Sequence, residues 1–94
     1  PGATRRTLVS GDNQTLVRIE IEQDHTVPEH VHPHEQVGTV IAGRISITIQ
    51  EQTTIIESGG SYLIPGDLPH SVTALEPTTL IECFAPVRDE FAHD

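Results

Sequence analysis

The chain has 94 residues and a formal net charge of −9, which arises from 14 acidic residues against five arginines and no lysine. This balance argues against nucleic-acid binding and against an anionic membrane surface, because both require clustered basic residues. No apolar run approaches the roughly 20 residues of a transmembrane helix and no secretory signal stands at the start, so we expect a cytoplasmic protein.

The chain reads as β-structure throughout. Apolar residues alternate with polar ones in residues 17–22 and 44–50, which is typical of half-buried strands. Glycine and proline interrupt the pattern at short intervals, and no window shows a helical repeat. We predict an all-β protein, a sandwich or small barrel forming one domain over residues 1–94 with its core at about 6–86. The predicted strands are 6–10, 14–22, 25–32, 36–42, 44–50, 53–57, 61–65, 70–75 and 78–85.

Six histidines are many for so short a chain, and two of them, His30 and His32, are two residues apart. On a strand both imidazoles point to the same face, which supplies two ligands of a facial metal triad. Gln36 follows beyond Pro33 and can return to the same site, where its amide oxygen would be a neutral, weaker ligand. On its own, however, such a pair is more often two surface histidines.

The remaining histidines differ in their surroundings. His70 opens a strand after a rigid turn, which fixes the direction of its imidazole. His25 and His93 have no partner at ligand spacing, so we expect both at the surface. His34 follows Pro33, and its place between solvent and the mouth of the site stays open.

Taken together, two segments resemble the paired motifs of the cupin superfamily. The resemblance implies a small antiparallel jelly-roll barrel of the RmlC-like type, with one divalent metal ion per chain inside it. The first motif is matched by His30, His32, Gln36 and Gly43, and the second by Gly59, Pro65 and His70. The ligand set implied by this resemblance is His30, His32, Gln36 and His70.

The chain departs from these motifs at four positions. Asp24 and Asp67 replace glycines, Ala74 replaces an asparagine, and Gln36 replaces a glutamate. The last change matters most, because three imidazoles and an amide leave a divalent ion with its full charge. Such an ion would be a stronger Lewis acid and would favour an anionic substrate. Zn, Ni, Fe and Mn all fit this set of donors.

The C-terminal segment, residues 80–91, resembles small cupins of the pectin-degradation type, which linearise unsaturated uronates. The resemblance implies a catalytic carboxylate at Glu82, where aspartate is usual, a pocket-lining Phe84, and an Arg88 that holds the sugar acid. Alternation places Glu82 and Phe84 on one face of the strand and Cys83 on the other. It leaves open which face lines the pocket, and Arg88 fits the surface equally well. Tyr62 is expected to serve barrel packing.

Three functions follow as hypotheses. The first is ring opening of a small carboxylated sugar, with Glu82 as general acid and base and Arg88 paired with the substrate carboxylate. The second is a metal-dependent dioxygenase or a polyketide-cyclase-like cupin. The third is a binding module without turnover. The small core and the resemblance also predict a homodimer that buries one sheet face.

Overall fold

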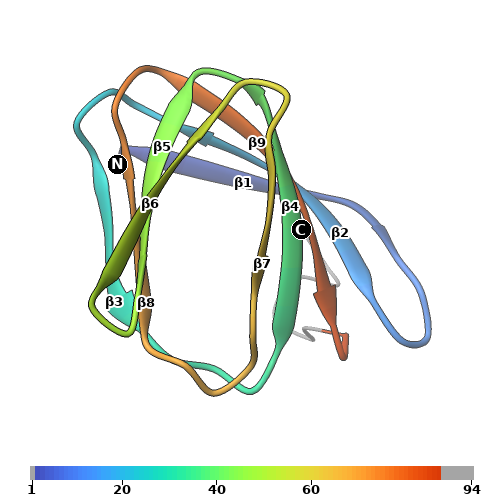
Figure 1. Ribbon diagram of the computed structural model, residues 1–94. Helices are drawn as coiled ribbons and strands as arrows, with labels where there is room; N and C mark the ends of the chain where they lie inside the picture. Colours follow the sequence, from blue (N-terminus) through green and yellow to red (C-terminus); the bar gives the residue numbers. More distant parts are fainter. Residues whose placement is uncertain (1, 88–94) are drawn as a thin grey trace.

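The structure is a computed structural model that describes residues 2–87, and these form nine strands (Figure 1). In this range there is no helix that is long and apolar enough to cross a membrane. The strands are β1 (Ala3–Ser10), β2 (Thr15–Ile21), β3 (Thr26–His30), β4 (Glu35–Ala42), β5 (Arg44–Ile49), β6 (Gln52–Glu57), β7 (Ser61–Ile64), β8 (His70–Ala74) and β9 (Thr78–Ala85).

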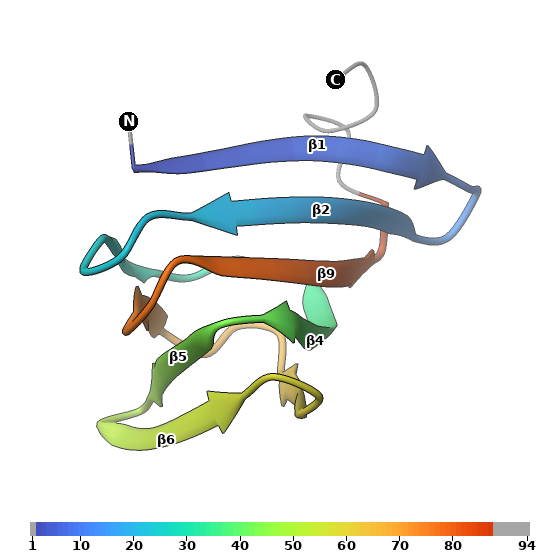
Figure 2. The same cartoon turned by 90° about the horizontal axis from the view of Figure 1, so that it is seen from above.

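The strands build two antiparallel sheets. One has the order β1-β2-β9-β4-β7 and the other the order β3-β8-β5-β6. In the view from above, β1, β2 and β9 of the first sheet face β5 and β6 of the second (Figure 2). The prediction of an all-β barrel or sandwich is confirmed.

The core lies between the inner faces of the two sheets, as the period-two alternation requires. Most buried inner positions are apolar, while their neighbours along the strand point outward. Burying these side chains is the main stabilising term of the fold, at about 25 cal/mol for each Å² of apolar surface removed from water. The central cluster is Ile21, Val40, Ile45, Ile47, Ile64, Val72, Ala74 and Leu80.

Two predicted strand boundaries were wrong, one by three residues and one by two. β1 begins at Ala3 rather than at residue 6, because its pairing with β2 continues to Ala3 opposite Ile21. β3 ends at His30 rather than at residue 32. Its pairing with β8 is already irregular between Val27 and His30, and Pro33 just beyond has no N–H to donate to a ladder.

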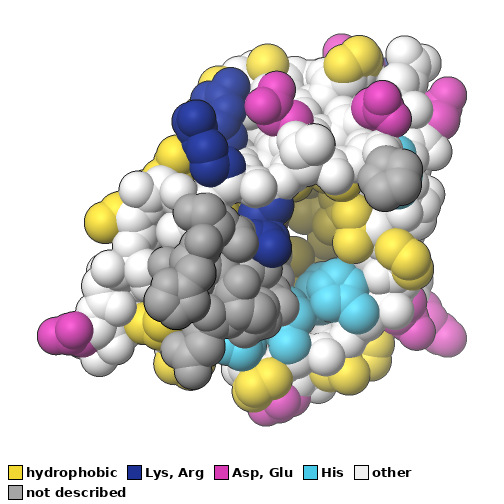
Figure 3. Space-filling view, turned by 180° about the vertical axis from the view of Figure 1, so that it is seen from behind, with side chains coloured by type: hydrophobic (Ala, Val, Ile, Leu, Met, Phe, Trp, Pro, Cys, Tyr) yellow, Lys and Arg dark blue, Asp and Glu magenta, His cyan; other side chains and the backbone are white. Residues whose placement is uncertain are grey.

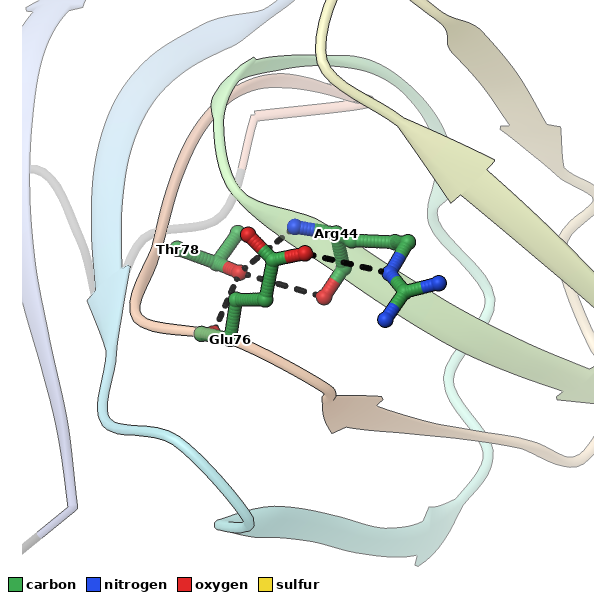
Figure 4. A network of polar contacts seen from close by, with 3 residues as sticks. All are labelled: Arg44, Glu76 and Thr78. Carbon is green, nitrogen blue, oxygen red and sulfur yellow. Dashed lines mark hydrogen bonds and ion pairs between the residues drawn. The ribbon is translucent and has the colours of Figure 1, made fainter.

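The turns at one end of the barrel are tied together by a polar network (Figure 4). The backbone N–H of Arg44 donates to Thr78 Oγ1 at 3.2 Å, and the Thr78 hydroxyl donates to the carbonyl of Glu76 at 2.8 Å. The Arg44 guanidinium pairs with the Glu76 carboxylate at 3.2 Å. This network joins the β4–β5 turn to the β8–β9 turn at the top of Figure 1. The end of β3 and the start of β8, which carry His30 and His70, lie at the opposite end.

Candidate metal centre

Three imidazoles converge at this opposite end of the barrel. His30 ends β3 and His70 begins β8, and the sheet register places them directly opposite each other. The ring centroid of His70 lies 4.3 Å from that of His30 and 4.9 Å from that of His32. One ring nitrogen from each of the three lies within 4.8 Å of the others, so they are close enough to bind a metal ion.

Backbone carbonyls fix the orientation of all three rings. Nδ1 of His30 lies 2.9 Å from the carbonyl of Pro28, and Nδ1 of His70 lies 2.9 Å from that of Leu68. Nδ1 of His32 makes the same kind of contact with the carbonyl of His34, at 3.1 Å. A carbonyl can only accept, so each Nδ1 carries a proton, and in the neutral imidazole each Nε2 then keeps its lone pair. This is the arrangement that outer-shell partners impose on metal-binding histidines.

His32 reaches the site from a loop, not from a strand as predicted. The N–H of Asp67 donates to the carbonyl of His32 at 2.8 Å, which joins the loop before β4 to the loop after β7. Gly66 makes this crossing possible, because a Cβ at that position would collide with the carbonyl oxygen of Pro33. The loop contacts, and not strand periodicity, therefore place the second imidazole.

Two of the motif departures are explained by backbone conformation. Asp24 has a φ of 66° and Asp67 a φ of 63°, both in the left-handed region that favours glycine. Aspartate tolerates this region better than most residues, because its short polar side chain can hydrogen-bond locally. Both aspartates thus occupy the glycine positions of the motifs in a backbone conformation that glycine adopts readily.

Gln36 lies in the same cavity as the histidines. The cavity has a volume of about 130 Å³, and its polar lining comes from His30, His70, Gln36 and Glu82. The side chain of Gln36 is 5% exposed, and its buried Oε1 has no hydrogen-bond partner among residues 2–87. A buried amide oxygen is costly unless it is paired, and a cation would supply the missing partner. The donors present therefore fit a metal ion.

The structure places Glu82 and Phe84 in this cavity, which decides the question that alternation left open. Both belong to β9, and their side chains are 4% and 3% exposed. Cys83 points to the outer face, where its thiol donates to Gln14 Oε1 at 3.3 Å. The ring of Phe84 lies 6.1 Å from that of His32, so an apolar wall adjoins the imidazoles.

Tyr62, which the sequence predicted to serve barrel packing, also contacts a residue of the site. It packs against the core, and its hydroxyl donates to Glu82 Oε2. Burial raises the pKa of Tyr62 above its ordinary value of 10.0, and the charge and hydrogen bond of Glu82 raise this pKa further. The phenol therefore stays protonated, and remains a donor, across the neutral range.

The raised pKa of Tyr62 predicts a loss of stability at alkaline pH. Above about pH 10 the unfolded chain releases the phenol proton and the folded chain keeps it, so the free energy of unfolding falls by about 1.4 kcal/mol per pH unit. The chain has no lysine and one tyrosine, so no other side chain has its ordinary pKa in this range. Urea unfolding at a series of alkaline pH values should show this slope, and Tyr62→Phe should remove it. An equal slope in Tyr62→Phe would contradict the burial argument.

Arg5 was not singled out from the sequence, and the structure places it on the sheet face that lines the cavity. The register places it opposite Ile19, which lines the cavity, so the two side chains share the inner face. From behind, the molecule shows a hollow with histidine and apolar side chains and a basic side chain at its edge (Figure 3). Arg88 and His93 lie outside the described residues, so their predicted places are not tested.

Of the other histidines, neither His25 nor His34 joins the cluster of three. His25 is half-buried beside Gly2, not fully at the surface as expected. The ring of His34 lies 5.6 Å from that of His32, next to the site but outside the triad.

Comparisons with known proteins agree with this geometry. The family model for the cupin domain matches residues 17–84. The pectin degradation protein KdgF of Dickeya dadantii (strain 3937) is 27% identical over 92 residues, which cover 96% of this chain and 84% of that protein.

Solved structures give the same result. KdgF from Halomonas sp. superposes with a TM-score of 0.90 at 25% identity, covering 96% of this chain and 85% of its own. An RmlC-like cupin from Shewanella frigidimarina NCIMB 400 also superposes with a TM-score of 0.90, at 24% identity. The match covers 96% of this chain and 81% of that one. The predicted jelly-roll fold and the resemblance to pectin-degradation cupins are confirmed, and the chain belongs to the cupin domain family.

Proposed function

We propose that this cupin is a metal-dependent enzyme that opens the ring of a small unsaturated uronate. The observation that carries the proposal is the composition of the cavity. A set of uncharged ligand atoms, including Nε2 of His30 and of His70 and Oε1 of Gln36, adjoins one buried carboxylate, that of Glu82. The relative named as a pectin degradation protein supports this class of substrate.

His30, His32, His70 and Gln36 would hold the ion. A bound divalent ion supplies Lewis acidity, which polarises an oxygen of the substrate. All four donors are uncharged, so the site would keep a positive charge that attracts a carboxylate-bearing sugar. Zn, Ni, Fe and Mn remain the candidate ions.

The chain's own residues would perform the proton transfers. Glu82 would accept the proton of the anomeric hydroxyl as the bond between the anomeric carbon and the ring oxygen breaks. The electron pair of that bond stays on the ring oxygen as an enolate. Glu82 then returns the proton to the carbon of the enolate double bond that does not bear the oxygen, which yields the keto form. The product is an isomer of the substrate, so no oxidant is needed, and Phe84 would keep water from the reacting atoms.

The assay for this function follows the loss of the conjugated double bond of an unsaturated uronate. Protein loaded with each candidate metal should turn over the sugar equally in air and without oxygen, and a chelator should abolish turnover. No turnover with any of the four metals would contradict the proposal. Activity that requires oxygen would indicate a dioxygenase, and binding without turnover would indicate a non-catalytic module.

Arg5 is proposed to pair with the substrate carboxylate. Arg88 is proposed to contact the same carboxylate. Replacing Arg5 in Arg5→Gln should raise KM for the uronate by about tenfold with little change in kcat, because one charged hydrogen bond is lost on binding. Arg6→Gln is the matched control. Arg6 is the next residue of β1, and its register partner Arg18 places it on the outer face. Equal KM values for the two variants would contradict the role of Arg5.

The outer face of the five-stranded sheet is proposed to form a homodimer interface. Val37 and Leu63 are 48% and 52% exposed there, and with Leu16, Ile81 and Cys83 they line a shallow groove. The groove contains no charged residue, although the chain carries a net charge of −9. Two copies could therefore approach through this face with the least repulsion.

Leu63→Glu should convert the dimer to a monomer, because it places two buried carboxylates in the interface. Sedimentation analysis measures the change. Ile55→Glu is the matched control, since Ile55 is 55% exposed on β6, the edge strand of the other sheet. A wild-type monomer, or a Leu63→Glu dimer, would contradict the proposed interface.

A further inference from the structure

A row of three residues crosses the inner face of the five-stranded sheet. Gly38 on β4 pairs with Tyr62 on β7 and, on its other side, with Glu82 on β9. Tyr62 and Glu82 therefore belong to strands that are not neighbours, with backbones roughly 10 Å apart at the usual strand spacing. The hydroxyl of Tyr62 nevertheless reaches Glu82 Oε2.

The glycine between them makes this contact possible. A Cβ built on Gly38 would lie 2.5 Å from both Cζ and Oη of Tyr62. Any side chain at this position would displace the ring that now lies across β4. Because Gly38 has no side chain, the Tyr62 ring can lie across β4 and its hydroxyl can reach the Glu82 carboxylate.

We propose that Tyr62 is a positioning residue, which holds the Glu82 carboxylate in the orientation needed for proton transfer in the cavity. The inference rests on the proposed function of Glu82. A glutamate side chain has several rotatable bonds, and a fixed donor selects one conformer before the substrate binds. Burial keeps the phenol protonated, so it serves as a donor and not as a competing base.

Tyr62→Phe removes the hydroxyl and keeps the ring. It should lower kcat roughly 10- to 100-fold, as expected when a catalytic group is misplaced by about 1 Å. KM should stay within about twofold, because Tyr62 does not line the cavity in which the sugar would bind. In a Glu82→Gln background the same substitution should cause no further loss, since the group it positions is already absent.

Gly38→Ala provides an independent variant, because it displaces the ring and leaves both Tyr62 and Glu82 in the chain. It should lower kcat as Tyr62→Phe does. Gly11→Ala is the control, since the nearest atom to a Cβ there is the Gln14 carbonyl oxygen at an ordinary 3.7 Å.

A spectroscopic readout needs no substrate. Tyr62 is the only tyrosine and the chain has no tryptophan, so its near-ultraviolet absorption reports on this phenol alone. Donation to a carboxylate shifts the band to longer wavelength. Glu82→Gln should reduce the shift, because a neutral amide is a weaker acceptor, and Gly38→Ala should reverse it, because it displaces the ring. An unchanged band in both variants, or wild-type kcat in Tyr62→Phe, would overturn the inference. Wild-type protein without uronate turnover would instead refute the proposed function, and the inference with it.

Discussion

Glu82→Gln is expected to lower kcat for uronate ring opening by roughly 10²- to 10⁴-fold, the usual contribution of a general acid or base. The amide keeps the shape of the side chain and can still accept the Tyr62 hydrogen bond, so the fold and the cavity should persist. KM and metal content should change little. Steady-state kinetics with metal-loaded protein measures the effect.

The control for this prediction is Glu20→Gln on β2. Glu20 is exposed on the outer face, where its Oε1 lies 3.8 Å from Nε of Arg18. Glu20→Gln therefore removes the same charge outside the cavity. Its kcat should equal that of the wild type. A Glu82→Gln enzyme with wild-type kcat would remove Glu82 from the mechanism and would leave its burial without a catalytic explanation.

Gln36→Glu is expected to lower kcat/KM for the uronate by roughly 10- to 100-fold, as an added buried charge nearby interacts by several kcal/mol. The new carboxylate would neutralise part of the ion's charge and would repel both the substrate carboxylate and Glu82. The same change should strengthen metal binding and enlarge the rise of Tm on metal addition, while the metal-free protein loses stability.

Gln23→Glu adds the same charge at an exposed loop position and should change neither property. The prediction separates two views of Gln36. If the amide only fills space, Gln36→Glu should leave the metal-induced rise of Tm as it is in the wild type. If the amide is a ligand, the rise should increase and activity should fall.

The sequence predicted the strands because alternation in segments such as 44–50 is a local signal, which the facing sheet then buries. Arg5 was missed for a non-local reason. The predicted strand began at residue 6, and only the pairing of β1 with β2 extends it to Ala3 and places Arg5 on the inner face.

The site was predictable where a local pattern marks a ligand, as in the spacing of His30 and His32 and at His70 after a recognisable turn. His32 was expected on a strand, and its true place depends on a loop crossing at Gly66 that no local pattern shows. Alternation alone could not decide which face of β9 points inward. The packing of the two sheets decides it, and it places Glu82 on the inner face. Tyr62 was missed as a partner of Glu82 because their contact depends on the pairing of three strands.

The central claim is that three imidazoles and an amide hold one divalent ion, and elemental analysis of the purified protein tests it most directly. The account predicts one equivalent of Zn, Ni, Fe or Mn per chain in the wild type, or after incubation with the metal and desalting. His30→Ala should hold little or none, while His25→Ala, outside the cluster, should match the wild type. A correctly folded wild-type protein that retains no metal under either condition would contradict the account.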